Sequence, residues 1–547
     1  MWHRYEPALR TAVSRALVCA AAAGRSCAEA DDLARGIASE GSSQAAKLLQ
    51  NHDSISAAST DAAPAAEFAP SAIAVLEVAY REAADAGVKQ VTCEHVLVGL
   101  VQQRLIDLSI TVDQAREICP TAAIADATMD EETRRSKIYD ELSAIHPDFS
   151  GDPYPLYQRL RQWPRVRRDP LLPVWVITGY DDVLAVLRDP RFTVQRKQSR
   201  TTGNSFSIDV LPDGPVRRQL GVLAGVLAKK MIFLDPPEHT RVRNLMNQNF
   251  TPRACEVMRP RIQQIADELV DRAIAEGKID LILDFALQLP IIVICEMIGF
   301  PPADRAQLKK WADAVGNTLA LGCTMRQELD ARRAMIDFRA YFDRIMEGVR
   351  REPSANNLLS MLVRAGYASS EEEQAELFSN CVFLLGAGHE TTTSLIGNGM
   401  RILKNHPDQL EKLREKPSLV AGAVEELLRF ESPVQWTSRQ AKENVQLGEV
   451  TIKAGDSVLI SLGAANRDPK QFADPDRLDI TRKDVHRHLA FSGGIHFCLG
   501  AGLSRVEAQV GLTTLLRRLP GLTIPEQKLR WKSGSTIRTL ESLPAAF

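Results

Sequence analysis

The sequence lacks the features that would place it in several large classes of protein. Its nine cysteines are odd in number and form no C-x-x-C pair, which argues against a disulfide framework and a structural zinc site. No apolar run reaches the roughly 20 residues of a membrane helix, because Leu281 to Phe300 is interrupted by Asp284, Pro290 and Glu296. A net charge of −2 excludes the basic bias of a nucleic-acid binder. We therefore expect a soluble, cytoplasmic protein that binds neither membrane nor nucleic acid.

The N-terminal part of the chain is rich in alanine and contains a duplication. A shift that places Tyr5-x-Pro7 on Phe68-x-Pro70 also places Gly24 on Gly87. The two units, 5–37 and 68–100, resemble the double-repeat N-terminal domain of the Clp unfoldases. We therefore predict a small all-α domain over 1–120, followed by a linker at 121–137. No G-x-x-x-x-G-K-[ST] phosphate loop occurs in the sequence, so the unfoldase motor is absent.

Residues 138–547 are predicted to form one large, mostly α domain. Long amphipathic helices dominate this part, and strand-like patterns occur at Val174–Thr178, Val450–Ile452 and Val458–Ser461. No internal linker interrupts the region, so we treat it as a single domain.

The segment 491–509, FSGGIHFCLGAGLSRVEAQ, carries the most specific chemical pattern. Its fixed positions are Phe491, Gly494, His496, Cys498 and Gly500. Chance occurrence of this five-position pattern in one such sequence is on the order of 2 in 100,000. The segment resembles the heme-thiolate loop of the cytochrome P450 family. The resemblance implies a helical prism with small β-sheets around heme b.

The residue types of this loop suit a thiolate ligand of iron. Cys498 would be the axial ligand, and its sulfur needs N–H donors and shielding from water. Gly494 and Gly500 would let the backbone approach the sulfur where a Cβ would collide. Phe491 could cover the ligand, and His496 could reach a heme propionate. The alternative is a buried free cysteine beside a glycine-rich turn.

A helix predicted from Ser370 to Asn405 carries a second cluster. Ser370-x-x-Glu373 is a capping box at its start. Its centre, LLGAGHETTTS, matches the family pattern [AG]-G-x-[DE]-T-[TS] from Ala387 to Thr392. The resemblance implies that small residues here open a groove over the iron, that Thr391 binds dioxygen and that Glu390 relays protons. A glycine-kinked core helix with a solvated Glu390 is the alternative.

Two further patterns of the family flank this helix in the sequence, in the order expected for the family. Glu426 and Arg429 lie three apart on one helix face, and the resemblance joins them to Arg477 in a buried triad with a folding role. His239 and Arg243 lie four apart at the start of a helix, in the H-x-x-x-R pattern, and Arg439 matches a third propionate ligand. Ordinary surface charges are the alternative for both patterns.

The resemblance implies a monooxygenase that inserts one oxygen atom from O2 into an apolar substrate. No attached flavin or iron–sulfur motif is present, so electrons are expected from a separate ferredoxin and its reductase. A basic stretch before the thiolate loop would receive ferredoxin or simply be solvated: Lys483, His486, Arg487 and His488.

Substrate identity is the least visible property. We expect recognition residues between Phe192 and Leu234, around 302–345, near Leu385 and Ala387, and near Val434–Thr437. Cations in the first of these ranges could indicate an acidic or carrier-bound substrate, but solvated charge is the favoured interpretation: Arg217, Arg218, Lys229 and Lys230. A rival hypothesis is a heme-containing recruitment or sensing protein that acts mainly through residues 1–120. If the chain is instead a working oxygenase, residues 1–120 could dock a protein partner.

Overall fold

The computed structural model describes residues 151–169, 174–195, 229–317, 325–353, 356–532 and 536–547, with the dipeptides Cys27–Ala28 (β1) and Glu67–Phe68 (β2). The predicted repeats and linker therefore lie outside the described residues, except for β1 and β2, which pair in parallel. Most described residues belong to one compact unit, composed of 132–199, 226–313 and 337–547. The following description concerns this unit.

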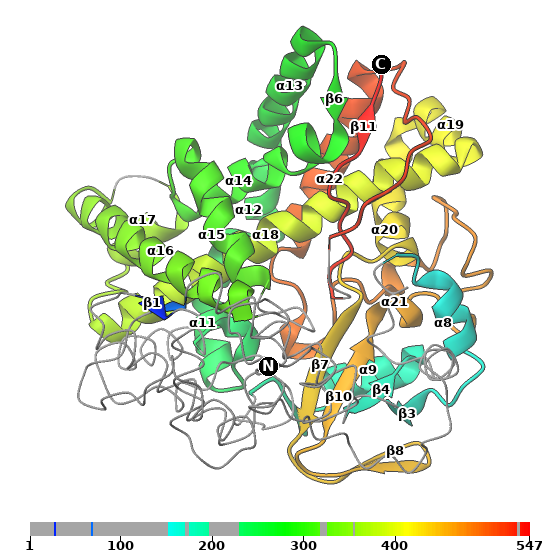
Figure 1. Ribbon diagram of the computed structural model, residues 1–547, viewed down its shortest axis with the longest axis horizontal. Helices are drawn as coiled ribbons and strands as arrows, with labels where there is room; N and C mark the ends of the chain where they lie inside the picture. The colour runs from blue at the N-terminus through cyan, green and yellow to red at the C-terminus, as the bar shows by residue number, and fades with distance from the viewer. Residues whose placement is uncertain are drawn as a thin grey trace, which may run out of the picture. The chain divides into compact units, whose positions relative to one another are not determined.

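Helices make up most of the described chain, as the sequence predicts (Figure 1). The α-helices are α8 (Tyr154–Leu160), α9 (Tyr180–Arg188), α11 (Glu238–Asn247), α12 (Pro252–Val257), α13 (Arg259–Glu276), α14 (Gln288–Ile298), α15 (Arg305–Asn317), α16 (Met325–Arg351), α17 (Leu358–Arg364), α18 (Glu371–Asn405), α19 (Pro407–Glu415), α20 (Val420–Phe430), α21 (Leu462–Ala465) and α22 (Ala501–Arg518). Single turns are η4 (Met231–Phe233), η5 (Gln248–Phe250), η7 (Pro302–Asp304), η8 (Pro417–Leu419), η9 (Val485–Arg487) and η10 (Gly494–His496), and η6 (Leu281–Ala286) is a π-helix.

One five-stranded sheet, ordered β3-β4-β10-β7-β5, lies beside the helices (Figure 1). Its strands are β3 (Val166–Arg168), β4 (Val174–Ile177), β10 (Ser457–Ser461), β7 (Trp436–Ala441) and β5 (Phe192–Thr193). β4 and β10 pair in parallel, with Val174 opposite Ser457, and the other neighbours are antiparallel. Two small antiparallel pairs are β8 (Val445–Leu447) with β9 (Val450–Ile452), and β6 (Ile279–Asp280) with β11 (Pro544–Ala545). The three predicted strands are confirmed.

The long helix α18 forms the centre of the helical part. Its predicted capping box is confirmed, because Ser370 Oγ accepts from the Glu373 amide at 3.1 Å and Glu373 accepts from the Ser370 amide. Helices α14, α20 and α22 pack against it. Close packing depends on small residues: a Cβ at Gly399 would approach Leu427 of α20 to 3.0 Å. Burial of most of its length makes α18 a fixed element on which side chains are positioned.

The most apolar segment of the described residues is a core element. Leu281–Ile298, formed by η6 and α14, has a mean hydropathy of 2.2, and 61% of it is buried in the unit. Its apolar side chains pack beside α13 and α18. Burial inside the protein explains its composition.

Candidate active site

Cys498 lies between η10 and α22, in the loop predicted to bind iron. Its amide donates to the Phe491 carbonyl at 2.9 Å and closes the loop. Among the described cysteines Cys498 is exposed, whereas Cys255, Cys295 and Cys381 are buried. Surrounding protein raises the pKa of the Cys498 thiol, but a hydrogen bond from the Gly500 amide and the charge of Arg243 act in the opposite direction. The loop therefore offers a sulfur that is open to a ligand, and the Gly500 amide and Arg243 partly offset the effect of burial on the thiol pKa.

The glycines of this loop have different roles. Gly494 has a φ of +67°, and a Cβ there would lie 2.3 Å from the Leu187 carbonyl oxygen of α9, so glycine is required twice over. Gly500 has a φ of −84°, and a Cβ would meet no protein atom within 4 Å. The predicted collision at Gly500 is therefore not found with protein atoms, and its contribution is the amide. Ser492 adopts the left-handed region at φ +62°.

Phe491 is buried beside the loop and is held by aromatic and cationic neighbours. Its ring lies 6.2 Å from that of Phe497, edge to face. The Arg505 guanidinium stacks over it at 4.5 Å. These contacts fix an apolar side chain next to the cysteine loop, as the sequence predicts.

Four basic side chains from three elements come together near Cys498. The rings of His239 on α11 and His496 on η10 are 4.4 Å apart, and each has a buried Nε2 atom with no hydrogen-bond partner in the described chain. Burial first, and then the charges of Arg439 and Arg243, lower the pKa of His496 to about 3. Burial also lowers the pKa of Arg439, on β7, to about 10. Within this cluster, Arg243 donates to the Phe497 carbonyl at 2.7 Å.

This basic cluster fits the two propionates of heme b. Buried donors are normally satisfied, so two unpartnered imidazole nitrogens beside two guanidinium groups indicate a missing acceptor. Guanidinium groups bind carboxylates in particular. The residues predicted from the H-x-x-x-R pattern and Arg439 are thus brought together with His496 of the thiolate loop, although they are far apart in sequence.

The middle of α18 carries the predicted oxygen-activation residues. Thr391 Oγ1 donates to the Ala387 carbonyl at 2.8 Å. A Cβ at Gly388 would approach Ile294 of α14 to 3.0 Å, whereas a Cβ at Gly386 would meet nothing within 4 Å. Gly388 therefore allows close packing of α14 against α18. The sequence pattern predicts instead that this glycine helps to open a groove.

Glu390 is part of an ionic network that the sequence does not reveal. Its Oε1 lies 3.0 Å from Lys532 Nζ, in the C-terminal segment. The preceding residue, buried His389, lies 3.4 Å from the Asp313 carboxylate on α15. Burial alone would raise the pKa of Asp313, but His389 and Lys309 hold it at about 2. Glu390 is therefore ion-paired. The alternative in the sequence analysis, a freely solvated Glu390 on a kinked core helix, does not describe this carboxylate.

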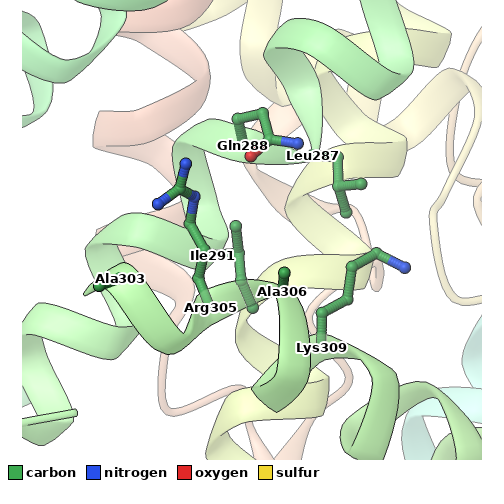
Figure 2. Close-up of a pocket in the computed structure, with 7 residues that line it drawn as sticks. All are labelled: Leu287, Gln288, Ile291, Ala303, Arg305, Ala306 and Lys309. Atoms are coloured by element: carbon green, nitrogen blue, oxygen red, sulfur yellow. The ribbon is translucent and has the colours of Figure 1, made fainter. Parts of the chain in front are cut away.

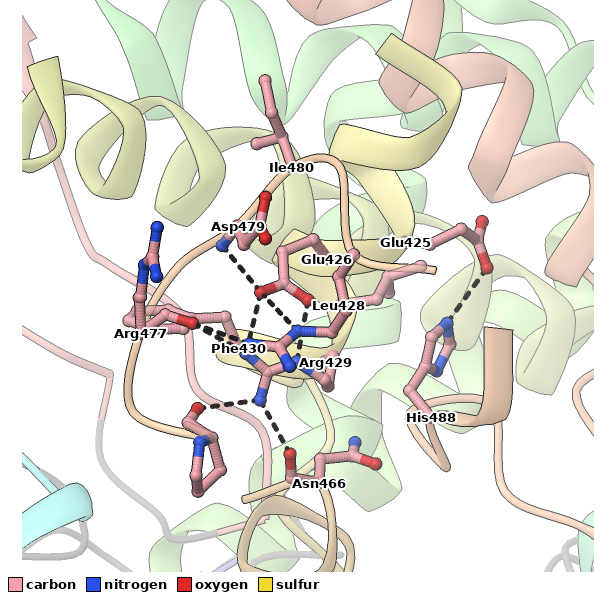
Figure 3. A network of polar contacts seen from close by, with 12 residues as sticks. Glu425, Glu426, Leu428, Arg429, Phe430, Asn466, Arg477, Asp479, Ile480 and His488 are labelled. Atoms are coloured by element: carbon pink, nitrogen blue, oxygen red, sulfur yellow. Dashed lines mark hydrogen bonds and ion pairs between the residues drawn. The ribbon is translucent and has the colours of Figure 1, made fainter. Parts of the chain in front are cut away.

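The Glu426–Arg429 pair is completely buried at the end of α20 (Figure 3). Two hydrogen bonds of 2.7 and 2.8 Å join the side chains. The remaining donors of Arg429 reach backbone carbonyls of Asn466 and Pro475 at 3.0 and 2.9 Å. Glu426 also accepts from the Asp479 amide at 2.9 Å.

The third arginine of this network is Arg482, and the prediction of Arg477 is wrong. Arg482 Nε lies 3.2 Å from Glu426 Oε1. The side chain of Arg477 is exposed, and only its backbone carbonyl accepts from Arg429, at 3.3 Å. The chain turns after Asp474, which has a φ of +46°, so carbonyls face inward at 475–477 and the side chain faces outward. Arg482, further along the same segment, brings its side chain back to Glu426.

The basic stretch before the loop divides into exposed and buried members. Lys483, His486 and Arg487 are exposed. His488 is buried, and its Nε2 lies 3.1 Å from Glu425 Oε2. Arg505 of α22 binds the same carboxylate at 2.7 Å. His488 therefore supports the cysteine loop from within and does not belong to an exposed docking surface.

The sequence patterns do not predict that two ionisable side chains, Glu507 and Lys230, are buried. Glu507 on α22 is 1% exposed, and neither carboxylate oxygen has a partner in the described residues. Burial raises its pKa well above the usual range, with Thr392 acting in the opposite direction. Lys230 is 4% exposed, which contradicts its interpretation as a solvated charge, whereas Lys229 is paired with Glu372 at 3.0 Å. Arg217 and Arg218 lie outside the described residues.

A separate pocket lies between α14 and α15 (Figure 2). Leu287, Ile291 and Ala306 form its apolar lining, with Arg305 and Lys309 at its edge. None of the predicted ligand, propionate or oxygen-activation residues lines it. Lys309 is paired with Asp313.

Comparison with known proteins gives the same assignment as the site. The sequence model of the family "Cytochrome P450" matches residues 319–536. The biotin biosynthesis cytochrome P450 of Bacillus subtilis is 37% identical over 74% of this chain and 98% of its own length. The cytochrome P450 monooxygenase PikC of Streptomyces venezuelae is 41% identical over 74% and 93%.

Solved structures extend the comparison to the fold. P450BioI in complex with hexadec-9Z-enoic acid ligated acyl carrier protein matches with a TM-score of 0.66 and 37% identity, covering 73% of this chain and 100% of that one. The myxobacterial CYP267B1 in complex with myristic acid matches with a TM-score of 0.65 and 38% identity, covering 74% and 98%. With relatives matched over nearly their whole length, this chain belongs to the cytochrome P450 family and is a heme-binding oxidoreductase.

Proposed function

We propose that the chain is a heme-thiolate monooxygenase that inserts one oxygen atom from O2 into an apolar substrate, either free or bound to a carrier protein or peptide. The observation that carries the proposal is the exposed Cys498 beside a basic cluster with unpartnered imidazole nitrogens. Relatives whose names specify monooxygenation and a carrier-bound acyl ligand support both substrate forms.

The residues of the loop and the basic cluster would hold heme b. Cys498 would ligate the iron, with the Gly500 amide directed at its sulfur and Phe491 shielding it from water. The propionates would be bound by His239, Arg243, Arg439 and His496. Gly494 keeps the loop against α9. When bound, heme supplies the reductive activation of dioxygen.

The residues of α18 would bind oxygen and deliver protons. Ala387 leaves room beside the helix, and the Thr391 hydroxyl, whose proton is held by the Ala387 carbonyl, has a lone pair free to accept. Glu390 takes a proton from solvent and passes it toward Thr391. Its ion pair with Lys532 connects this carboxylate to the C-terminal segment.

Electrons would come from a separate ferredoxin and its reductase. The exposed basic stretch, with Lys483, His486 and Arg487, would receive an acidic ferredoxin near the cysteine loop. Arg482, from the same segment, is engaged with Glu426 and would not contribute.

Residues 1–120 would form a Clp-N-like module, joined by the linker 121–137 to the heme domain 138–547, in a cytoplasmic protein. We favour a docking role for a protein partner or a carrier-tethered substrate. Truncation at residue 135 tests this role. Loss of turnover on a carrier-bound substrate, with unchanged turnover on the free one, supports docking. Unchanged kinetics on both, together with unchanged partner capture, discards it.

The reduced, carbon-monoxide-bound absorption spectrum tests the central assignment. We expect a strongly red-shifted Soret band in the wild type and its loss in Cys498→Ser. A band typical of histidine ligation, or no heme, would overturn the proposal. Attention would then move to the rival role, a recruitment or sensing protein acting through residues 1–120.

A further inference from the structure

Lys230 is a buried cation without a counter-charge among the residues that the structure describes. Its side chain lies just before η4 and is 4% exposed. Burial lowers the pKa of its ammonium group to about 8, and no neighbouring carboxylate opposes this effect. No hydrogen bond or ion pair joins the ammonium group to any described residue. An unpaired buried charge is costly, so its presence in a folded protein calls for a ligand or partner.

The acidic side chains nearest in the fold are already engaged. Glu372, at the start of α18, pairs with the neighbouring Lys229 at 3.0 Å. One turn further, Glu376 accepts from Arg241 at 3.0 Å and also from the Tyr367 hydroxyl. Neither carboxylate is free to neutralise Lys230.

Backbone hydrogen bonds fix this segment on the face of α18 that carries Thr391. The buried Asn380 side chain accepts from the Met231 amide at 2.9 Å and donates to the Lys229 carbonyl at 3.2 Å. In an α-helix Ala387 and Thr391 follow Asn380 on nearly the same face, about 10 and 16 Å further along the axis. Lys230 is therefore anchored beside the stripe of α18 that leads to the oxygen-binding position.

The other end of the same short segment reaches the basic cluster. Asp235 accepts from the Thr193 hydroxyl and from the Val194 amide, next to β7. His239 and Arg243 follow on α11. The segment from Lys230 to Arg243 thus runs from α18 to the proposed propionate site.

We propose that Lys230 binds the terminal carboxylate or phosphate of an apolar substrate whose other end reaches Thr391. This inference rests on the proposed function and specifies the chemical class of its substrate. The ammonium group pairs with the anion in a setting with little competing water, where such a pair is stronger than at the surface. The axial separation of about 16 Å between Asn380 and Thr391 suits an extended chain of roughly 12 carbons.

The test compares three probes that share one tail: dodecanoate, dodecyl phosphate and 1-dodecanol. Each is titrated into the full-length holoprotein, with binding measured from the change in the Soret band and by calorimetry. Lys230→Met removes the charge, Lys230→Arg keeps it, and Lys229→Met is the matched control at the exposed neighbour.

We expect the wild type to bind at least one anion about 10- to 100-fold more tightly than the alcohol. Lys230→Met should lose that preference and keep alcohol binding, whereas Lys230→Arg and Lys229→Met should retain the preference. Tighter dodecanoate than dodecyl phosphate assigns a carboxylate substrate, and the reverse order assigns a phosphate ester.

Two results would overturn the inference: equal binding of anions and alcohol by the wild type, or an anion preference that survives in Lys230→Met. Failure of both anions to bind overturns it as well. The carbon-monoxide spectrum separates this failure from that of the proposed function. A red-shifted band with no anion preference refutes only the role of Lys230, and a missing band refutes the heme-thiolate assignment.

Discussion

The unit contains two groups of ionisable side chains that differ in how their hydrogen bonds are satisfied. In the Glu426–Arg429 group, carboxylate and guanidinium find partners in each other, in Arg482 and in backbone groups. In the basic cluster, the Nε2 atoms of His239 and His496 have none in the described chain. Glu426 and Arg429 are completely buried, whereas Arg243 and His496 of the basic cluster are only partly buried. Only in the first group do the charged side chains find all their partners within the described residues. We call a group closed when its ionic side chains are paired with one another, and such a group contributes to folding. We call a group open when buried polar atoms lack a partner, and such a group indicates where an external anion binds.

Breaking the closed group should have the largest effect. Arg429→Ala leaves Glu426 buried without its main partner, at a cost of about 3–5 kcal/mol in the free energy of unfolding. We expect little or no folded heme protein, measured as the yield of the carbon-monoxide band. Arg477→Ala is the control and should change stability by less than about 0.5 kcal/mol, because its side chain is exposed. Equal damage by both substitutions would restore Arg477 to the triad.

A second closed group, formed by Glu425 with His488 and Arg505, supports the cysteine loop. Burial alone would raise the pKa of Glu425, but Arg505 and His488 outweigh burial and hold the pKa at about 2. Because the folded-state pKa is depressed, the stabilisation is present above about pH 4.5 and is lost as pH falls toward 2. Glu425→Gln should lower the free energy of unfolding by about 2–3 kcal/mol at pH 7.

Thermal midpoints of the wild type and Glu425→Gln, measured between pH 7 and pH 3, check this prediction. The difference between them should shrink as the pH falls. Glu415→Gln is a suitable control, since this residue is exposed at the end of α19. A constant difference across the pH range would contradict the ionic origin of the stabilisation.

Mutation of the open cluster should stabilise the apoprotein against unfolding but weaken the retention of heme. Arg439→Leu removes a desolvated charge, so the apoprotein should unfold at a higher temperature. The same change should speed heme loss about 10-fold or more, because a charged hydrogen bond to a propionate is missing. Transfer of heme to apomyoglobin measures the loss, and exposed Lys442→Met is the control. A higher unfolding temperature of the apoprotein without faster heme loss would argue against a propionate role.

The smallest effect is expected at Ser492. Its φ of +62° lies in the left-handed region, which costs a non-glycine residue about 1–2 kcal/mol. Ser492→Gly should raise the free energy of unfolding by about 1 kcal/mol, with the carbon-monoxide spectrum unchanged. Denaturation midpoints measure the gain. Ser504→Gly, inside α22, should instead destabilise by about the same amount.

Local patterns predicted local structure well. The capping box at Ser370, the strand patterns and the spacing around Cys498 depend on residues close in sequence, and the elements and loop they indicate are present. The proximity of His239 to His496 is expected only because the family resemblance gives both residues as contacts of the heme propionates. Hydrophobic periodicity alone does not predict it.

Side-chain partners across the fold could not be predicted in this way. Spacing does not reveal that the turn at Asp474 directs Arg477 outward and brings Arg482 to Glu426. Composition around Lys230 suggested solvated charge, since burial depends on how the segment lies on α18. The Glu390–Lys532 pair joins α18 to the C-terminal segment, and no local signal marks it.

The contact between Gly494 and the Leu187 carbonyl has a consequence for biosynthesis. More than half the length of the chain separates these two residues, and α22 follows the loop directly. The cysteine loop can therefore reach its final form only after α9 and nearly all of the C-terminal part have been synthesised. Such long-range pairing forms slowly and late. Cofactor capture should accordingly follow release from the ribosome, and a nascent chain truncated before α22 should bind no heme.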